Sequence, residues 1–144
     1  RIVGEGDYRE AIIYAIEQLG LRNEVTITGK LSQEQIKEQM EWADIYIQPS
    51  IQEGFCNAVL EAQSMGLLCI VTDAEGLKEN VLDGKTGWVV PKRSPKCMFK
   101  QIVDILSMES SDREKIINNA TTRIKEKFNL LDQSKYWDEF YYNH

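Results

Sequence analysis

The run LLCIVTD, residues 67–73, is the feature that most constrains how this chain can fold. It is apolar almost throughout, whereas a strand with one face in water alternates apolar and polar residues. Such a run is typical of a strand buried on both faces of a parallel sheet. Parallel strands need crossover connections, so the segments around this run are expected to supply helices.

Strand and helix patterns alternate over the first 90 residues. Strands are predicted from RIVGEGD (1–7), EVTITG (24–29), DIYIQPS (44–50) and DGKTGWVVP (83–91). Helices are predicted where apolar residues recur three and four positions apart: Tyr8, Ala11, Ile12, Ala15, Ile16 and Leu19 before Gly20, and Ala58, Val59, Ala62 and Met65 before Gly66.

Two more helices are predicted between these strands. Ser32 and Gln35 form a capping box, which opens a helix that carries Ile36 and Met40 inward and ends near Ala43. A short helix follows Gly76.

From Ser94 onward the pattern is helical only. Ser94-Pro95 is predicted to start one helix with the stripe Met98, Phe99, Ile102, Val103 and Leu106. Ser111 and Glu114 are predicted as the capping box of a second, with Ile117, Ala120, Ile124 and Phe128. Asp132 would cap a last one, with Tyr136, Trp137, Phe140 and Tyr141.

These patterns predict an α/β fold, a doubly wound Rossmann-like parallel sheet with a helical C-terminal tail, in a single domain over residues 1–144. In such sheets ligands bind beyond the carboxyl ends of the strands. Here those ends are residues 4–6, 29–31, 49–57 and 73–76.

Composition narrows the functional classes. The formal net charge is −6, so nucleic acid is a poor candidate partner, and no apolar run approaches the roughly 20 residues of a membrane span. Cys56, Cys69 and Cys97 show no metal-site spacing, and His144 is the one histidine, which disfavours disulfides, zinc and a histidine base. A cytoplasmic protein without a metal is expected, its cysteines acting as small buried apolar residues.

Seven residues separate Glu53 from Glu61, in the pattern E-x7-E, across a turn that runs into a helix. A carboxylate can accept two hydrogen bonds from a vicinal diol, and the amides of residues 57–59 at the helix start suit a phosphate. Gly54 would let a ligand approach the backbone. The alternative is that Glu61 only complements the helix dipole and that Glu53 is a solvated loop charge.

An ordered series of motifs in this chain resembles the donor-binding half of a GT-B glycosyltransferase, in particular glycosyltransferase family 4. The series is PS, EGFC, VLEAQSMG, CIVTD, AEG, KENV and DGKTGWVV, preceded by RIVGEGD and VTITGKLS. The resemblance covers roughly residues 1–105. It implies one half of a GT-B fold whose donor is a UDP- or GDP-linked sugar, with no permanently bound cofactor and no metal.

The resemblance also assigns roles. Glu53 would be the catalytic residue that contacts the hydroxyls of the transferred sugar, and Glu61 would bind the ribose. The segment Gly54, Phe55, Cys56, Asn57, Ala58 and Val59 would contact sugar and diphosphate through its backbone. Gly29, Lys30 and Leu31 would lie along the base, and Gly4 and Gly6 would shape the floor near the phosphates.

Three positions depart from the family pattern. Cys56 replaces a usual Gly, residues 67–69 replace a common Gly-x-Pro-Val, and Glu75 replaces the first Gly of a Gly-Gly pair, where a charge facing inward would repel a diphosphate. The family's basic residues for the diphosphate, in a preceding strand-helix unit, have no counterpart here. That unit and the N-terminal acceptor domain are expected to be absent, so this chain alone is expected to be inactive.

The resemblance implies the donor-binding domain of a retaining hexosyltransferase that acts on a glycan or lipid-linked acceptor, with the N-terminal domain of the parent protein as partner. Any contact with the inner face of the membrane would belong to the missing parts. Three alternatives stay open: a degenerate non-catalytic GT-B module, a nucleotide-sugar epimerase-like enzyme, and a flavodoxin-like binding domain. The epimerase would need a histidine near the rim, and the flavodoxin-like domain would have no E-x7-E turn.

Overall fold

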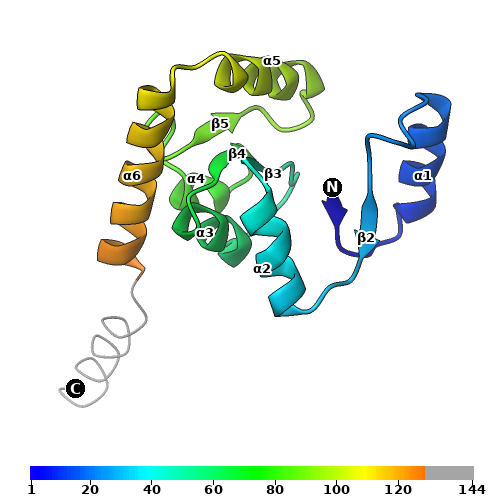
Figure 1. Cartoon of the computed structure of the whole chain (residues 1–144), viewed down its shortest axis with the longest axis horizontal. Helices are drawn as coiled ribbons and strands as arrows, with labels where there is room; N and C mark the ends of the chain where they lie inside the picture. The colour runs from blue at the N-terminus through cyan, green and yellow to red at the C-terminus, as the bar shows by residue number, and fades with distance from the viewer. Residues whose placement is uncertain (129–144) are drawn as a thin grey trace. The chain divides into compact units, whose positions relative to one another are not determined.

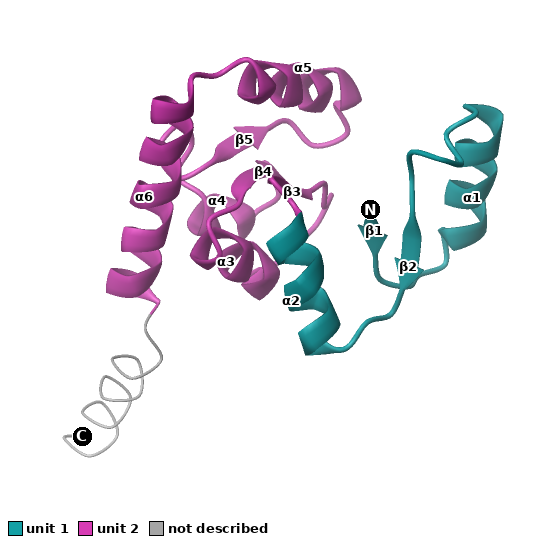
Figure 2. Cartoon of the chain, viewed as in Figure 1, with its two compact units in different colours: residues 1–42 teal, residues 43–144 magenta. Residues whose placement is uncertain are grey.

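A computed structural model describes residues 1–128 of the 144-residue chain. The described elements follow in the order β1 (Ile2–Val3), α1 (Arg9–Gln18), β2 (Ile27–Gly29), α2 (Gln33–Trp42), β3 (Ile45–Gln48), α3 (Asn57–Ser64), β4 (Leu68–Thr72), α4 (Leu77–Asn80), β5 (Trp88–Val90), α5 (Pro95–Leu106) and α6 (Ser110–Lys127) (Figure 1). They fall into two compact units, residues 1–42 and residues 43 onward (Figure 2). Each unit is described by itself below.

The first unit pairs β1 with β2 in parallel, and α1 connects the two strands. Helix α1 ends where the sequence predicts, because Gly20 takes a positive φ of 68° and its amide donates to the carbonyl of Glu17. The predicted capping box of α2 is also confirmed. The Gln35 amide donates to Ser32 Oγ at 3.3 Å, and the Ser32 amide donates to Gln35 Oε1 at 2.9 Å.

The second unit contains a parallel sheet of order β3-β4-β5, with β4 in the centre. All five residues of β4 are buried, as the apolar run 67–73 predicts. A central parallel strand shields both of its edges with neighbouring strands and both of its faces with helices, which explains why it lacks polar alternation.

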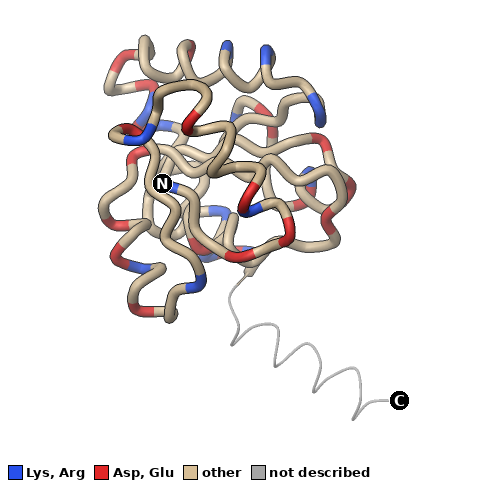
Figure 3. The backbone as a smooth tube through the Cα atoms, turned by 90° about the vertical axis from the view of Figure 1, so that its right-hand side faces the viewer, with Lys and Arg blue, Asp and Glu red and all other residues tan. Residues whose placement is uncertain are grey.

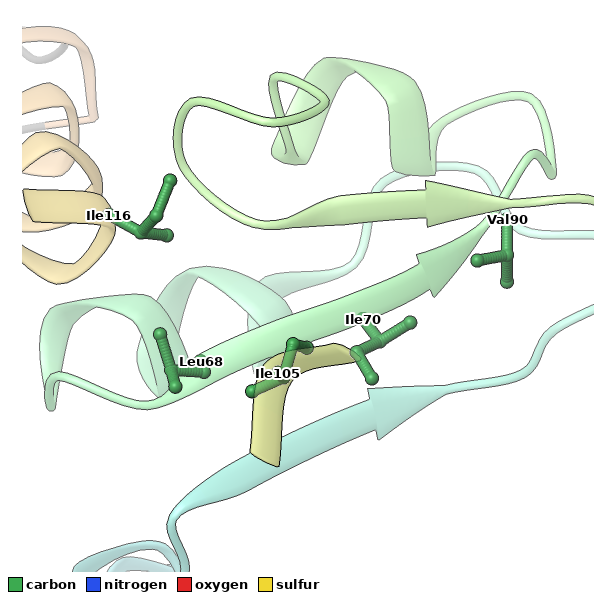
Figure 4. Close-up of a cluster of buried hydrophobic side chains, with 5 residues drawn as sticks. All are labelled: Leu68, Ile70, Val90, Ile105 and Ile116. Atoms are coloured by element: carbon green, nitrogen blue, oxygen red, sulfur yellow. The ribbon is translucent and has the colours of Figure 1, made fainter. Parts of the chain in front are cut away.

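Side chains of β4 point alternately to two helical layers. Leu68 and Ile70 face α5 and α6 and form a buried cluster with Val90, Ile105 and Ile116 (Figure 4). Helix α3 contacts β3 and β4 and lies on the other side of the strands (Figure 1). The predicted α/β fold class is therefore confirmed, with its five parallel strands in two sheets.

The predicted stripe of α5 is partly wrong. Phe99, Val103 and Leu106 are 68%, 45% and 61% exposed, whereas Ile105, which the stripe omits, is fully buried. The helix turns Met98, Ile102 and Ile105 toward the sheet. Apolar spacing alone did not indicate which of two adjacent apolar faces would meet the strands.

The capping box predicted at Ser111 and Glu114 is wrong. Helix α6 begins at Ser110, so Ser111 already lies inside its first turn. Glu109 is the N-cap, with extended backbone angles and no side-chain capping bond. The predicted last helix, with Asp132 and the aromatic residues Tyr136, Trp137, Phe140 and Tyr141, lies outside the described residues.

Two adjacent residues of α5 test this assignment of its buried face. Ile105→Ala is expected to lower the free energy of unfolding by about 2–5 kcal/mol, because it leaves a cavity between α5 and the sheet. Leu106→Ala changes an exposed side chain and is expected to cost about 0.5 kcal/mol or less. Urea unfolding followed by circular dichroism measures both, and equal losses in the two variants would contradict the assignment.

Candidate functional site

The loops that follow β3 and β4 are joined to each other. The Thr72 hydroxyl donates to the carbonyl of Ser50, and the Gly76 amide donates to the carbonyl of Glu53 at 3.1 Å. Parallel strands end at the same edge of a sheet, which is where the sequence analysis placed residues 49–57 and 73–76 as carboxyl ends of strands. In the structure these two segments are in contact.

Gly76 allows this meeting through its lack of a side chain. Its backbone angles are ordinary helical ones (φ −76°, ψ −18°), so conformational freedom is not the reason for glycine here. A Cβ atom at residue 76 would lie 0.9 Å from the carbonyl oxygen of Gly54, a distance that no packing tolerates. The backbone of residue 54 therefore rests directly on that of residue 76.

Asn80 holds the end of the same turn. Its side chain is fully buried, and Oδ1 accepts a hydrogen bond from the amide of Cys56 at 3.2 Å. Cys56 is the N-cap of α3, and its side chain makes no capping hydrogen bond. Its backbone amide is held by the Asn80 side chain. The sequence analysis missed this residue. Its spacing was a usable signal, because Asn80 follows Leu77 by three positions and so shares the buried face of α4.

Glu53 is oriented by a chain of polar side chains that starts on β3. The Tyr46 hydroxyl donates to Gln48 Oε1 at 2.7 Å, and Gln48 Nε2 contacts Ser50 Oγ at 2.8 Å. Ser50 Oγ in turn donates to Glu53 Oε2 at 3.2 Å. Burial raises the pKa of Tyr46, so its hydroxyl stays protonated and remains a donor.

Glu61 has a different environment. It is exposed on α3 in the fifth position of the helix, and within residues 1–128 its carboxylate has no hydrogen-bond or ion-pair partner. No acidic residue occupies the first turn of α3. The stabilisation of an acid by the helix dipole falls off beyond that turn. The helix dipole therefore explains little of the presence of an acid at position 61.

Glu75 does not present an uncompensated charge. Its carboxylate pairs with Lys92 Nζ at 3.2 Å, and its side chain is 71% exposed. Hydrogen bonds from its own backbone amide and from Lys92 lower the pKa of Glu75, so it is ionised and paired. Acidic and basic residues occur along the whole described backbone (Figure 3). The stretch between Lys37 and Lys78, however, carries seven acidic residues and no lysine or arginine.

The predicted burial of the three cysteines is right for two of them. Cys56 and Cys69 are buried, and burial raises the pKa of Cys69 to about 12 and raises that of Cys56 as well. Cys97 is exposed, because it lies on the side of α5 away from the sheet. All three are free thiols, and the described residues hold no group of three or more potential metal ligands.

A hollow of about 420 Å³ lies at the carboxyl ends of β4 and β5. Its polar lining includes Asp73, Lys78 and Asp83. Both carboxylates already serve the loops, because Asp73 Oδ1 accepts from the Lys92 amide at 2.7 Å and Asp83 Oδ1 accepts from the Val89 amide at 2.9 Å. They are structural groups at the edge of the hollow.

The other predicted site residues belong to the first unit. The Gly4 amide donates to the carbonyl of Gly29 at 2.9 Å, and both glycines have positive φ angles, 123° and 73°. The loops after β1 and β2 therefore meet, as expected for parallel strands. Gly6 and Lys30 are exposed, and Leu31 is half-buried.

Comparison with known proteins identifies the family. The model of the family "Glycosyl transferases group 1" matches residues 1–123, which include every residue of both loops described above. The chain belongs to this family. Its predicted membership in a glycosyltransferase family is thereby confirmed, and the segments Glu53–Glu61 and Gly76–Asn80 fall within the matched region.

Curated relatives of this glycosyl transferase chain include biosynthetic enzymes of bacteria. It is 32% identical over 130 residues to alpha-D-kanosaminyltransferase of Streptomyces kanamyceticus, which covers 90% of this chain and 33% of the relative. It is 28% identical over 134 residues to the amylovoran biosynthesis glycosyltransferase AmsK of Erwinia amylovora, covering 89% and 33%. The chain spans about a third of the length of these relatives.

Solved structures share the fold of this glycosyl transferase chain. Anabaena Alr3699/HepE in complex with UDP superposes with a TM-score of 0.89 and 22% identity, covering 99% of this chain and 40% of that protein. The same protein was also solved in complex with UDP-glucose. In the described part of the present chain, no helix combines the length and apolar character that crossing a membrane requires.

Alanine substitutions at Gly76 and Gly54 test the close packing between these two backbone segments. Gly76→Ala is expected to lower the free energy of unfolding by about 2–3 kcal/mol, since the new methyl group displaces the backbone of residue 54. Gly54→Ala meets no atom within 4 Å and is expected to leave stability nearly unchanged. Thermal unfolding of the two variants checks this, and a stable Gly76→Ala protein would contradict the close packing.

The three thiols are expected to react in an order set by burial. In the folded protein, Cys97 should react with Ellman's reagent within the mixing time of a manual assay, and Cys56 more slowly. Cys69 should react only after unfolding, because it is fully buried and its pKa of about 12 leaves almost no thiolate at pH 8. Single-cysteine variants assign each phase, and fast labelling of Cys69 in the native state would contradict its burial.

Proposed function

We propose that this chain is the nucleotide-sugar-binding domain of a retaining glycosyltransferase, which transfers a hexose or related sugar from a UDP- or GDP-linked donor to a glycan or lipid-linked acceptor. One observation carries the proposal. Glu53 and Glu61 flank a turn that is fixed on both sides by Gly76 and Asn80, within a glycosyl transferase family match. A sugar nucleotide has two diols, one on each side of its phosphates.

Glu53 is the proposed catalytic residue, in contact with the hydroxyls of the transferred sugar. A solvated loop charge would need no orienting partners. Here, a chain of hydrogen bonds runs from Tyr46 through Gln48 and Ser50 to the Glu53 carboxylate. Ser50 occupies one oxygen of Glu53, which leaves the other oxygen to accept from a ligand hydroxyl.

Glu61 is the proposed ligand of the ribose. It is exposed, in the fifth position of α3, and has no partner within the described residues. At the start of α3 the Val59 amide already donates to the Cys56 carbonyl at 3.2 Å. The amides of Asn57 and Ala58, with the partial positive charge of the helix start, are therefore the ones that suit the diphosphate. The backbone of residues 54–59 would contact sugar and diphosphate, and Gly54 has open space around it.

In the first unit, Gly29, Lys30 and Leu31 are the proposed contacts of the base, and Gly4 and Gly6 those of the phosphate floor. The two loops are joined by the hydrogen bond between the Gly4 amide and the Gly29 carbonyl, and neither of these residues has a side chain at that point. No resident cofactor or metal takes part in this proposal, because the helix start and basic side chains would neutralise the leaving diphosphate.

We further propose that transfer requires an acceptor domain in the same parent protein and that this chain alone only binds the donor. The length of the relatives supports this, since the chain covers a third of each. Two relatives, named for kanosaminyl transfer and for amylovoran biosynthesis, favour sugar transfer in the assembly of glycans or glycosides. The reaction would take place in the cytoplasm, with any attachment at the inner membrane face residing in the rest of the parent.

UDP is the first nucleotide to test, because the structurally similar Anabaena protein was solved with UDP and with UDP-glucose. We expect saturation-transfer NMR to show contacts from this chain to the ribose and base of one nucleotide among UDP, GDP and ADP. Glu61→Ala is expected to weaken that binding at least about tenfold, because it removes a charged hydrogen-bond acceptor worth roughly 1.5–3 kcal/mol.

Glu114→Ala, which alters an exposed acid on α6, is the control and should bind as the wild type does. Adding the glucose and mannose conjugates then compares sugars on the same base, and Glu53→Gln should affect the conjugates more than the bare nucleotide. Binding of no nucleotide by a folded wild-type chain would favour the degenerate module over a donor domain.

A further inference from the structure

Arg123, on α6, is bonded to the end of α4. Its Nη1 donates to the carbonyl of Asn80 at 2.9 Å, and its Nη2 donates to the carbonyl of Glu79 at 2.6 Å. These are the last two residues of α4, whose terminal carbonyls lack intrahelical partners. The planar guanidinium presents two N–H donors in a fixed fork to the two adjacent acceptors, a geometry that the ammonium of a lysine does not reproduce.

Asn80 connects this contact to the proposed donor site. Its backbone carbonyl is held by Arg123, and its side-chain Oδ1 accepts from the amide of Cys56 at the N-cap of α3. Asn80 is fully buried, and within the described residues its Nδ2 has no partner. A buried donor without a partner destabilises the folded protein. An apolar residue would avoid that cost but would leave the Cys56 amide without its acceptor.

The end of α6 also contacts the turn of residues 53–56 directly, through Phe128. The rings of Phe55 and Phe128 lie 5.8 Å apart between centroids, and the Arg123 guanidinium lies 5.0 Å from the centroid of Phe128. Arg123 is thus held between the carbonyls of α4 and an aromatic ring that itself packs on residue 55. Its surroundings leave it few alternative positions.

We propose that Arg123 is a positioning residue for the turn of residues 53–56, acting through Asn80. By holding the end of α4, it keeps the Asn80 side chain under the Cys56 amide, and this sets the direction of the first turn of α3. The consequence for donor binding rests on the proposed function, because the amides at the start of α3 are the proposed diphosphate contacts. The link from Arg123 to Cys56 does not depend on it.

Arg113 supplies a matched control on the same helix. Its Nε donates to the carbonyl of Met108 at 3.1 Å, and its Nη2 donates to the carbonyl of Leu106 at 2.6 Å, at the end of α5. It therefore makes the same kind of bond to two main-chain carbonyls without touching Asn80. A merely stabilising role would give Arg113→Gln and Arg123→Gln the same consequences.

The experiment records ¹⁵N–¹H spectra and amide hydrogen exchange of the full chain with each glutamine variant, followed by titration with UDP. Both variants are expected to lower the urea midpoint. Arg123→Gln alone should shift the Cys56 amide signal, speed its exchange about tenfold and weaken UDP binding about tenfold, which corresponds to 1.4 kcal/mol for each. Arg123→Lys is the second variant should the glutamine variant not fold.

Asn80 variants test whether Arg123 acts on the Cys56 amide through Asn80. Asn80→Leu removes the acceptor and should reproduce the Cys56 shift, and adding Arg123→Gln to it should change that signal little further, because the two residues act in series. Asn80→Asp keeps the acceptor oxygen and should retain the slow exchange of Cys56. An unchanged Cys56 amide in Arg123→Gln, or an equal change in Arg113→Gln, would overturn the proposal. If the wild type binds no nucleotide, the proposed function fails, and the Cys56 amide still decides the link.

Discussion

The burial of β4 is the constraint on which the rest of the second unit depends. This strand pairs on both edges and is covered on both faces, so its position is set by contacts from β3, β5, α3, α5 and α6. Because all three strands are parallel, their carboxyl ends lie at one edge, and the loops that leave them are brought together. The geometry of the candidate site follows from this arrangement of the strands.

The turn between β3 and α3 is held by contacts from several parts of the second unit. Gly76 lies under the carbonyl of Gly54, Asn80 binds the Cys56 amide, and Ser50 binds both Thr72 and the Glu53 carboxylate. Ligand sites need groups held close to their working geometry, since a misplaced group loses most of its interaction energy. These supports come from α4 and from strands of the central sheet, so the turn inherits their rigidity.

Local sequence patterns predicted part of this arrangement, and the errors in the prediction have clear physical origins. The capping box at Ser32 and Gln35 was predictable because its two hydrogen bonds are local to four residues. The similar pattern at Ser111 and Glu114 failed because Glu109 already takes the extended conformation that precedes α6. The exposed side of α5 was misjudged because apolar residues occupy more of its circumference than the sheet covers.

By itself, the sequence determined the α/β class, the central buried strand and the pair of acids around the turn, because each depends on short-range patterns. Ordered motifs such as EGFC, VLEAQ and KENV determined the family, which the match over residues 1–123 shows. Only the tertiary structure decided that Asn80 reaches Cys56, that Arg123 reaches Asn80 and that Glu75 pairs with Lys92. These contacts join residues 17 to 43 positions apart. Their partners are selected by packing in three dimensions, which no local pattern encodes.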